Sequence, residues 1–158
     1  MTAAGRVVGL QRSGGGVPKR AVEEAQVTFA GMEGDWQRNR KHHGGPDRAL
    51  CIYSMELIQA LAAEGHPITP GSTGENVTIA GIDWRLMQPG VVLEIGGATV
   101  ELTAFAVPCR TIEGSFLGGR SVRISEKLYP GWSRVYARVL AEGAISLGDR
   151  VDVRATQQ

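Results

Sequence analysis

The residue best placed to carry chemistry in this sequence is Cys109, which follows a predicted β-strand over residues 98–105. Pro108 cannot donate to a β-ladder and restricts the residue before it to extended geometry, so we expect Cys109 at the rim of the sheet. Arg110 comes next, and a neighbouring guanidinium favours the thiolate, the form that attacks electrophiles and binds metals. The sequence therefore predicts a reactive or metal-binding thiol, although free cysteine is also a common small core residue.

The densest polar segment of the chain, residues 36–48, is the second candidate for function. Its basic and imidazole side chains are Arg38, Arg40, Lys41, His42, His43 and Arg48, with Asp47 as the one acid near them. Adjacent histidines point to opposite sides of an extended backbone, so we expect only one of His42 and His43 to face a bound ligand. The segment predicts a local positive patch for an anionic ligand such as a phosphorylated cofactor, with a solvated basic loop as the alternative.

Two glycine-containing loops could bring further polar groups to the same ligand. Three consecutive glycines at 14–16 leave the backbone free to form an anion-binding nest, and Lys19 is placed to contact a phosphate. The loop over residues 70–76 delivers Glu75 and Asn76 onto a predicted strand at 77–80. The Asn76 amide offers donors and an acceptor. These could bind the edge of a heterocycle, and they could equally stabilise a turn by hydrogen bonds.

Composition bounds the class of protein. The chain has 158 residues, which suits one domain, and its 17 basic and 16 acidic residues give a net charge of +1. This balance gives no bulk electrostatic reason to expect nucleic acid or a membrane as a partner. No apolar run is long enough to span a bilayer and no signal peptide is recognisable, so we expect a cytoplasmic protein with Cys51 and Cys109 as free thiols.

Glycine falls at turns between short runs rich in Val, Ile and Thr, which predicts an all-β barrel or sandwich. We expect one helix over residues 55–64, capped by Ser54 and ended by Gly65. Residues 113–128 are either a mobile loop or a short irregular piece. Cys51 lies in a strand that is apolar on both faces, so a core thiol is expected there. The predicted strands span residues 6–10, 21–29, 48–53, 77–80, 91–95, 98–105, 136–140 and 150–153.

Several spaced motifs, taken together, resemble the MOSC domain, which is named after the C-terminal part of molybdenum cofactor sulfurases and also occurs in stand-alone bacterial proteins of the YiiM type. The resemblance covers about residues 6–153 and implies a single MOSC domain over residues 1–158. The motifs are Gly16-Val-Pro-Lys19, Gly34-Asp35, His43-Gly-Gly-Pro-Asp-Arg-Ala49, Gly74-Glu-Asn-Val-Thr78, Pro108-Cys109, Pro130-Gly-Trp132, Tyr136-Ala-Arg-Val-Leu140 and Gly148-Asp149.

The resemblance implies a mostly β, MOSC-type barrel with one or two short helices. It also implies a cysteine that either carries sulfur or binds molybdenum held by the pterin dithiolene of the molybdenum cofactor (molybdopterin), and this cysteine maps onto Cys109. The cofactor-binding residues expected with it are Lys19, His42, His43, Arg48, Glu75, Asn76 and Arg110.

Four functions remain open at this point. The leading one is a molybdenum-cofactor-dependent oxidoreductase that reduces N-hydroxylated or N-oxide compounds. Because the sequence holds no iron–sulfur or flavin motif, its electrons would come from an external redox protein. The second is a sulfurtransferase in which Cys109 carries a persulfide from a sulfur-donor protein. A non-catalytic cofactor-binding module and a cysteine hydrolase using Cys109 with His42 or His43 complete the set.

Overall fold

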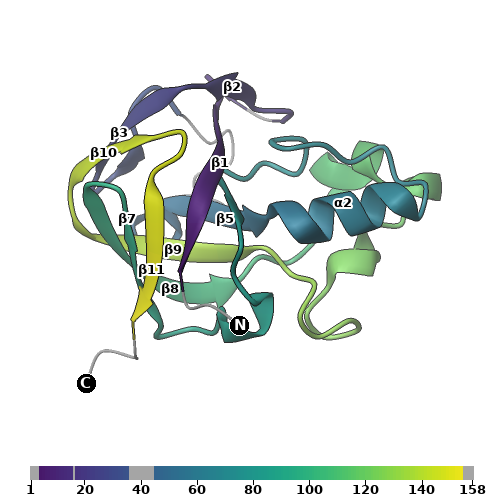
Figure 1. Cartoon of the computed structure of the whole chain (residues 1–158). Helices are drawn as coiled ribbons and strands as arrows, with labels where there is room; N and C mark the ends of the chain where they lie inside the picture. Colours follow the sequence, from purple (N-terminus) through teal and green to yellow (C-terminus); the bar gives the residue numbers. More distant parts are fainter. Residues whose placement is uncertain (1–3, 16, 36–44, 155–158) are drawn as a thin grey trace.

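The computed structural model describes residues 4–15, 17–35 and 45–154, and these form a mostly β structure (Figure 1). Its strands are β1 Ala4–Arg12, β2 Arg20–Val22, β3 Glu24–Thr28, β4 Gly31–Met32, β5 Leu50–Ser54, β6 Val77–Ala80, β7 Val92–Ile95, β8 Ala98–Phe105, β9 Val135–Ala141, β10 Gly143–Ser146 and β11 Arg150–Arg154. The helices are α2 Met55–Ala63 and the 3₁₀ turns η1 Pro46–Arg48, η2 Trp84–Leu86, η3 Arg110–Ser115, η4 Leu117–Gly119 and η5 Ser121–Ile124.

Seven strands close into a barrel in the order β11-β7-β8-β9-β5-β6-β1, with β1 pairing back onto β11. The long strand β1 pairs with β11 through its first half and with β2 through its second half, while β6 runs along its other edge. The β5–β6 pair is parallel and the other barrel pairs are antiparallel. A small second sheet has the order β10-β3-β4. The predicted MOSC-type β-barrel is confirmed.

The strand β5 is buried along its whole length, as its apolar sequence predicts. Leu50 and Ile52 pack in the main core together with most of the barrel's apolar residues. Cys51 lies on the opposite face of the strand, directly across from Tyr136 of β9, and these two residues form a separate buried cluster with Ala106. This second face of β5 and β9 is where polar groups gather.

The helix α2 begins where the sequence predicts. The Ser54 hydroxyl accepts a hydrogen bond from the Leu57 N–H at 3.2 Å, and Ile58 and Leu61 are buried. The helix ends before Gly65, whose φ of +101° suits a glycine. In Figure 1, α2 lies beside the barrel together with the segment that carries η3, η4 and η5. Within the described part of the chain, no helix is both long and apolar enough to cross a membrane.

At three places the structure corrects or completes the local predictions. The strand expected over residues 21–29 is divided into β2 and β3. Strand β10, which begins at Gly143, is missing from the predicted strands, because its sequence is short and weakly apolar and it is held by pairing with β3. Residues 113–128 contain 3₁₀ turns with Ile124 buried, whereas Val122 and Leu128 are exposed.

Candidate functional site

Cys109 lies just beyond the end of β8, at the position that the Pro108 signal predicts. Its thiol is free and half-buried, and the turn η3 begins at the next residue, Arg110, whose side chain is exposed. The Cys109 Sγ lies 2.8 Å from the Thr111 hydroxyl oxygen, a hydrogen-bond contact. The chain therefore presents one accessible sulfur atom at the rim of the barrel.

Behind this rim, the second face of β5 and β9 is lined by Cys51 and Tyr136, with Arg48 over the Tyr136 ring at 5.2 Å from its centroid. Burial raises the pKa of Tyr136 to about 12, and the charges of Cys51 and Cys109 add to this effect while those of Arg134 and Arg48 oppose it. Both thiols and both guanidinium groups are thus near enough to Tyr136 to influence its ionisation. Residues from η1, β5, β9 and the end of β8 meet here.

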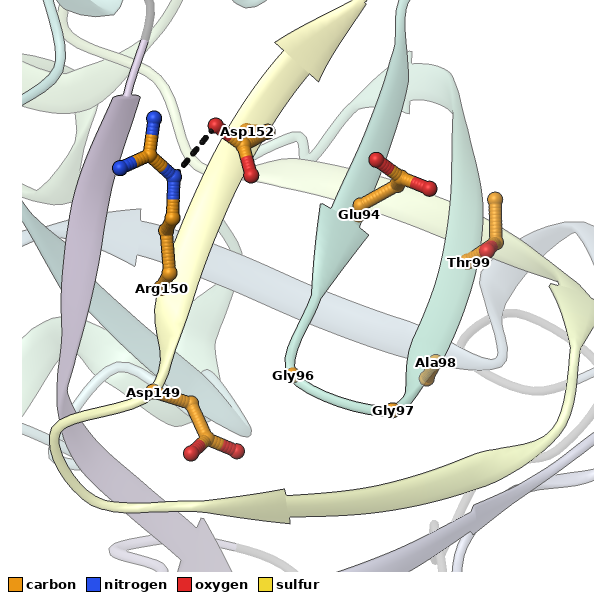
Figure 2. A pocket seen from close by; sticks show the side chains of 8 residues that line it. All are labelled: Glu94, Gly96, Gly97, Ala98, Thr99, Asp149, Arg150 and Asp152. Carbon is orange, nitrogen blue, oxygen red and sulfur yellow. Dashed lines mark hydrogen bonds and ion pairs between the residues drawn. The ribbon is translucent and has the colours of Figure 1, made fainter.

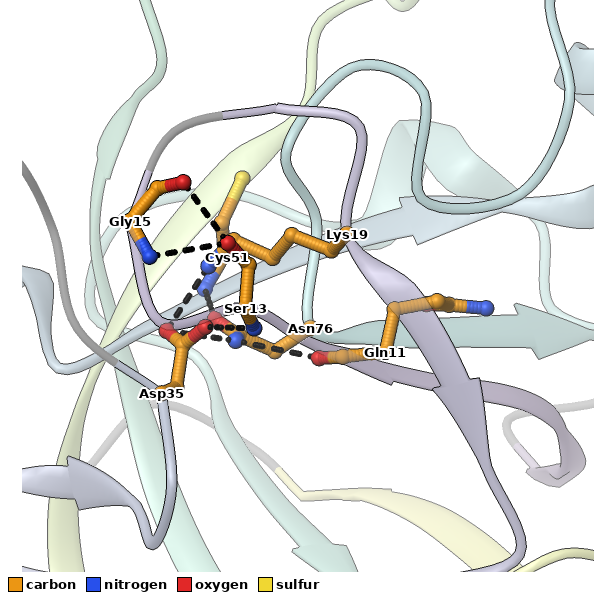
Figure 3. A network of polar contacts seen from close by, with 7 residues as sticks. All are labelled: Gln11, Ser13, Gly15, Lys19, Asp35, Cys51 and Asn76. Carbon is orange, nitrogen blue, oxygen red and sulfur yellow. Dashed lines mark hydrogen bonds and ion pairs between the residues drawn. The ribbon is translucent and has the colours of Figure 1, made fainter.

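A network of buried polar contacts continues from Cys51 toward the first loop of the chain (Figure 3). The Lys19 ammonium lies 2.7 Å from Asp35 Oδ2, and each of these side chains is 5% exposed. The other oxygen of Asp35 accepts a hydrogen bond from the Ser13 N–H at 2.9 Å. The Lys19 N–H also donates to the Gly71 carbonyl at 3.0 Å, which joins this loop to the one that carries Asn76.

Asn76 connects this network to the thiol face. Its Oδ1 accepts from the Cys51 N–H at 3.0 Å, and its own N–H donates to the Cys51 carbonyl at 2.7 Å. Its Nδ2 donates to Asp35 Oδ2 at 3.0 Å. The side chain is fully buried and its oxygen and nitrogen are both used by the protein. Burial also raises the pKa of Cys51 to about 11, against the opposing charge of Arg134, so this thiol stays protonated at neutral pH.

Glu75 is fully buried next to Asn76. One carboxyl oxygen accepts a hydrogen bond from the Thr73 hydroxyl at 3.0 Å, and the other has no hydrogen-bond partner among the described residues. Burial raises the pKa of this carboxyl group above its ordinary value, while hydrogen bonds to the carboxyl group and the charge of Arg134 oppose the shift. A neutral carboxylic acid is the form that such surroundings favour.

The structure thus brings several predicted residues into one continuous region. Lys19 and Asn76 both bind Asp35, Asn76 binds the backbone of Cys51, and predicted Arg48 stacks on Tyr136, which lies across from Cys51. His42 and His43 lie outside the described residues, together with Arg38, Arg40 and Lys41.

Sequence reasoning missed three members of the region. Asp35 and Tyr136 stand inside motifs that were recognised, but their polar roles were not assigned. Arg134 has no motif to mark it, and a single buried arginine just before a strand looks like any other strand-flanking cation in the sequence.

A polar pocket elsewhere on the barrel is not this site (Figure 2). Its carboxylates are bound by the protein's own donors: Asp149 Oδ2 accepts from the Ser146 N–H at 2.8 Å and Asp152 Oδ1 from Arg150 Nε at 2.8 Å. None of the predicted site residues lines it. The residues around it are Glu94, Gly96, Gly97, Ala98, Thr99, Asp149, Arg150 and Asp152.

Comparison with known proteins finds a family and two curated relatives. A sequence model described as the MOSC domain matches residues 39–152. The chain is 29% identical over 140 residues to the uncharacterized protein YflK of Bacillus subtilis, covering 87% of this chain and 62% of YflK. It is 32% identical over 97 residues to the protein YiiM of Escherichia coli, covering 59% of this chain and 43% of YiiM. The matches thus span less than two thirds of either relative.

Two solved structures share the fold. The crystal structure of YiiM from Escherichia coli superposes with a TM-score of 0.71 at 24% identity, covering 97% of this chain and 71% of that one. The YUAD protein from Bacillus subtilis superposes with a TM-score of 0.72 at 19% identity, covering 98% of this chain and 97% of that one. At such low identities the likeness concerns the fold.

Proposed function

The chain belongs to the MOSC domain family, a family associated with the molybdenum cofactor, and from this premise we propose that it binds that cofactor with Cys109 as the protein ligand to molybdenum. The observation that carries the proposal is the position of Cys109, a half-buried free thiol at the rim of the barrel beside a face lined by buried polar groups. A thiolate is a soft ligand and suits a molybdenum centre.

The described residues suit a metal ion that is also bound by ligands from its cofactor. They contain no group of three His, Cys, Asp or Glu side chains arranged to hold a metal ion. A single thiolate is therefore what this part of the chain would supply, and the dithiolene sulfurs of the pterin would complete the coordination. The unpartnered oxygen of buried Glu75 also lies in the region, beside the Asn76 loop.

The cofactor-binding residues of this proposal are those expected from the sequence. Exposed Arg48 and Arg110 would attract the cofactor's phosphate, and His42 and His43 belong to the same basic segment. Lys19 already binds Asp35, so it would have to exchange this carboxylate for the phosphate in order to contact the cofactor. Glu75 and Asn76 would support the site from beneath. We propose that residues 1–158 form one MOSC domain.

The proposed reaction is the reduction of N-hydroxylated or N-oxide compounds. When bound, the cofactor would supply two-electron chemistry. The N–O bond of the substrate breaks, its oxygen leaves as water, and the two electrons and two protons come from an external redox protein and from solvent. Cys109 would anchor the metal, while the buried face with Cys51 and Tyr136 would exclude water on one side. Both cysteines are free, which favours a reducing cytoplasm as the compartment.

Molybdenum analysis tests this proposal. Protein purified from a host that makes the cofactor is expected to contain molybdenum, and Cys109→Ala should lose most of it, by about tenfold or more, because its protein ligand is gone. Cys51→Ala is the matched control, since it removes the other thiol, and it should keep the metal. If wild type and Cys109→Ala carry equally little molybdenum, the proposed cofactor role is wrong.

The accessibility of Cys109 favours a second candidate, sulfur transfer. The Thr111 hydroxyl at 2.8 Å could donate to a sulfur anion at this position as readily as to a thiolate. Incubation with a cysteine desulfurase and cysteine should then add one sulfur to Cys109, seen by intact mass and lost on reduction. A protein that stays unmodified under conditions that load a known sulfur carrier does not have this function.

A further inference from the structure

Arg134 is a buried guanidinium that the chemistry proposed so far does not use. It stands immediately before β9 and is 5% exposed. Its Nη1 donates to the Thr73 carbonyl at 2.6 Å and its Nη2 to the Val107 carbonyl at 3.4 Å. No carboxylate forms an ion pair with it within the described part of the chain, and its Nε is buried without a partner there. A buried charge held only by backbone carbonyls is costly, so packing alone does not explain it.

The backbone around Arg134 is itself firmly held. The carbonyls of Trp132, Ser133 and Arg134 accept hydrogen bonds from the Tyr53 hydroxyl at 2.6 Å, Trp84 Nε1 at 2.7 Å and the Ala106 N–H at 2.9 Å, respectively. Since three consecutive carbonyls are fixed to three different strands or turns, the guanidinium projects from a rigid base.

The two carbonyls that Arg134 binds belong to the two loops of the candidate site. Thr73 precedes Glu75 and Asn76, and Val107 precedes Cys109 by two residues. The Val107 side chain is 77% exposed, so it adds little packing beyond buried Ala106. The planar guanidinium can reach both carbonyls at once, whereas a lysine ammonium is a compact point charge.

We propose that Arg134 is a positioning residue: it fastens the segment that carries Cys109 to the loop that carries Glu75 and Asn76, and so fixes where the Cys109 sulfur stands. The inference deepens the proposed function, because it takes Cys109 as the functional thiol. The proposed role of Arg134 in holding the Cys109 segment is nevertheless a property of the cofactor-free protein, and the experiment tests it in that form.

The experiment compares Arg134→Met and Arg134→Lys with a matched control, Arg123→Met. Arg123 is also a partly buried arginine next to Trp132, with its guanidinium 4.0 Å from that ring and 2.8 Å from Glu64, but it binds neither Thr73 nor Val107. A nitroxide is attached to Cys109, the more accessible thiol; intact mass shows that one label is present, and peptide mapping shows that Cys51 is unlabelled. The electron paramagnetic resonance spectrum then reports the mobility of the segment, and hydrogen exchange reports the amides of residues 106–111.

In Arg134→Met we expect a more mobile nitroxide and about tenfold faster exchange of these amides, because two charge-assisted hydrogen bonds are lost. Arg134→Lys should lie between wild type and Arg134→Met, since it can keep one carbonyl contact. Arg123→Met should leave both readouts at wild-type values, even if its melting temperature falls as far as that of Arg134→Met.

Equal mobility in Arg134→Met and wild type, or an equal increase in Arg123→Met, overturns the proposal. If Arg134→Met does not fold, the comparison of Arg134→Lys with Arg123→Met decides by the same criteria. The proposed function fails separately: wild-type protein without molybdenum, combined with a mobile segment in Arg134→Met, refutes cofactor binding and leaves the positioning role standing.

Discussion

The two cysteines of this chain differ in environment and therefore in chemistry. Cys51 is 3% exposed on a central strand, and burial raises its pKa to about 11. Cys109 stands beyond the end of a strand, half-buried, with a hydroxyl as its neighbour. A thiol becomes a good ligand or nucleophile only where its thiolate can form and be reached. Position along the strand, and not residue type, separates the buried thiol from the accessible one.

The buried side chain of Glu75 predicts that the free energy of unfolding depends on pH. Because its folded-state pKa lies above the ordinary value of 4.5, the folded protein holds this proton more tightly than the unfolded chain. The resulting stability is present at low pH and is lost as the pH rises through the folded-state pKa. Glu75→Gln cannot ionise, so its free energy of unfolding should rise relative to that of wild type as the pH is raised above the ordinary carboxyl pKa of 4.5.

Denaturant unfolding across this pH range measures the difference. The matched control is Glu24→Gln, which removes the same charge from an exposed position on β3. Parallel stability curves for Glu75→Gln and wild type would contradict the raised pKa of the buried carboxyl group.

At the scale of elements, one amide side chain joins several parts of the fold. Asn76 stands at the entrance to β6, bonds to Cys51 of β5, and reaches Asp35 in the segment after β4. Its backbone carbonyl also accepts from the Gln11 N–H of β1 at 2.9 Å. A side chain that both donates and accepts is required at this junction, and the amide of asparagine supplies a separate acceptor oxygen and donor nitrogen.

The junction predicts a large effect for Asn76→Asp. The change removes the Nδ2 donors and places a carboxylate about 3 Å from Asp35 Oδ2, so like charges meet in a buried site. We expect a loss of about 3 kcal/mol or more in the free energy of unfolding at neutral pH, measured by denaturant titration. The loss should shrink in acid, because protonation of either carboxylate removes the repulsion. Asn76→Ala, which adds no charge, serves as the control and should lack this acid recovery.

At the scale of the whole molecule, a closed barrel carries a helical side layer. The turns η5 and η4 reach the end of α2 and the loop after it through the Arg123–Glu64 ion pair and the hydrogen bond from the Leu117 N–H to His66 Nδ1, respectively. In Figure 1 this layer lies on one side of the barrel, beyond the end of β8. Cys109 lies between the end of β8 and the start of η3, where the chain leaves the barrel for the helical side layer.

Close approach of β10 to the β7–β8 hairpin predicts a packing defect for Gly143→Ala. A Cβ at Gly143 would lie 2.0 Å from the Gly97 carbonyl oxygen, a backbone atom that cannot rotate away. We expect a loss of about 2–3 kcal/mol in the free energy of unfolding, because the hairpin must move. Gly114→Ala is the control: no atom lies within 4 Å of its added Cβ, and its cost should stay within about 0.5 kcal/mol. Equal losses in thermal or denaturant unfolding would contradict the close approach.

The sequence by itself determined the features that depend on a few neighbouring residues. The strands at 77–80 and 98–105 have the predicted bounds, Ser54 caps the helix, and Cys109 follows Pro108 out of the sheet. Alternation, capping and proline geometry act over a few residues, which is why a local pattern reveals them. The spaced motifs also indicated the MOSC family, whose match to residues 39–152 is now shown.

Only the tertiary structure decided which distant groups meet. Lys19 pairs with Asp35 across 16 residues, and Arg134 reaches Thr73 across 61. The strand β10 exists because β3 pairs with it, although its own sequence is weakly apolar. Such contacts are fixed when the barrel closes and brings separate loops to one face, and the energy that selects them comes from burial of the whole core.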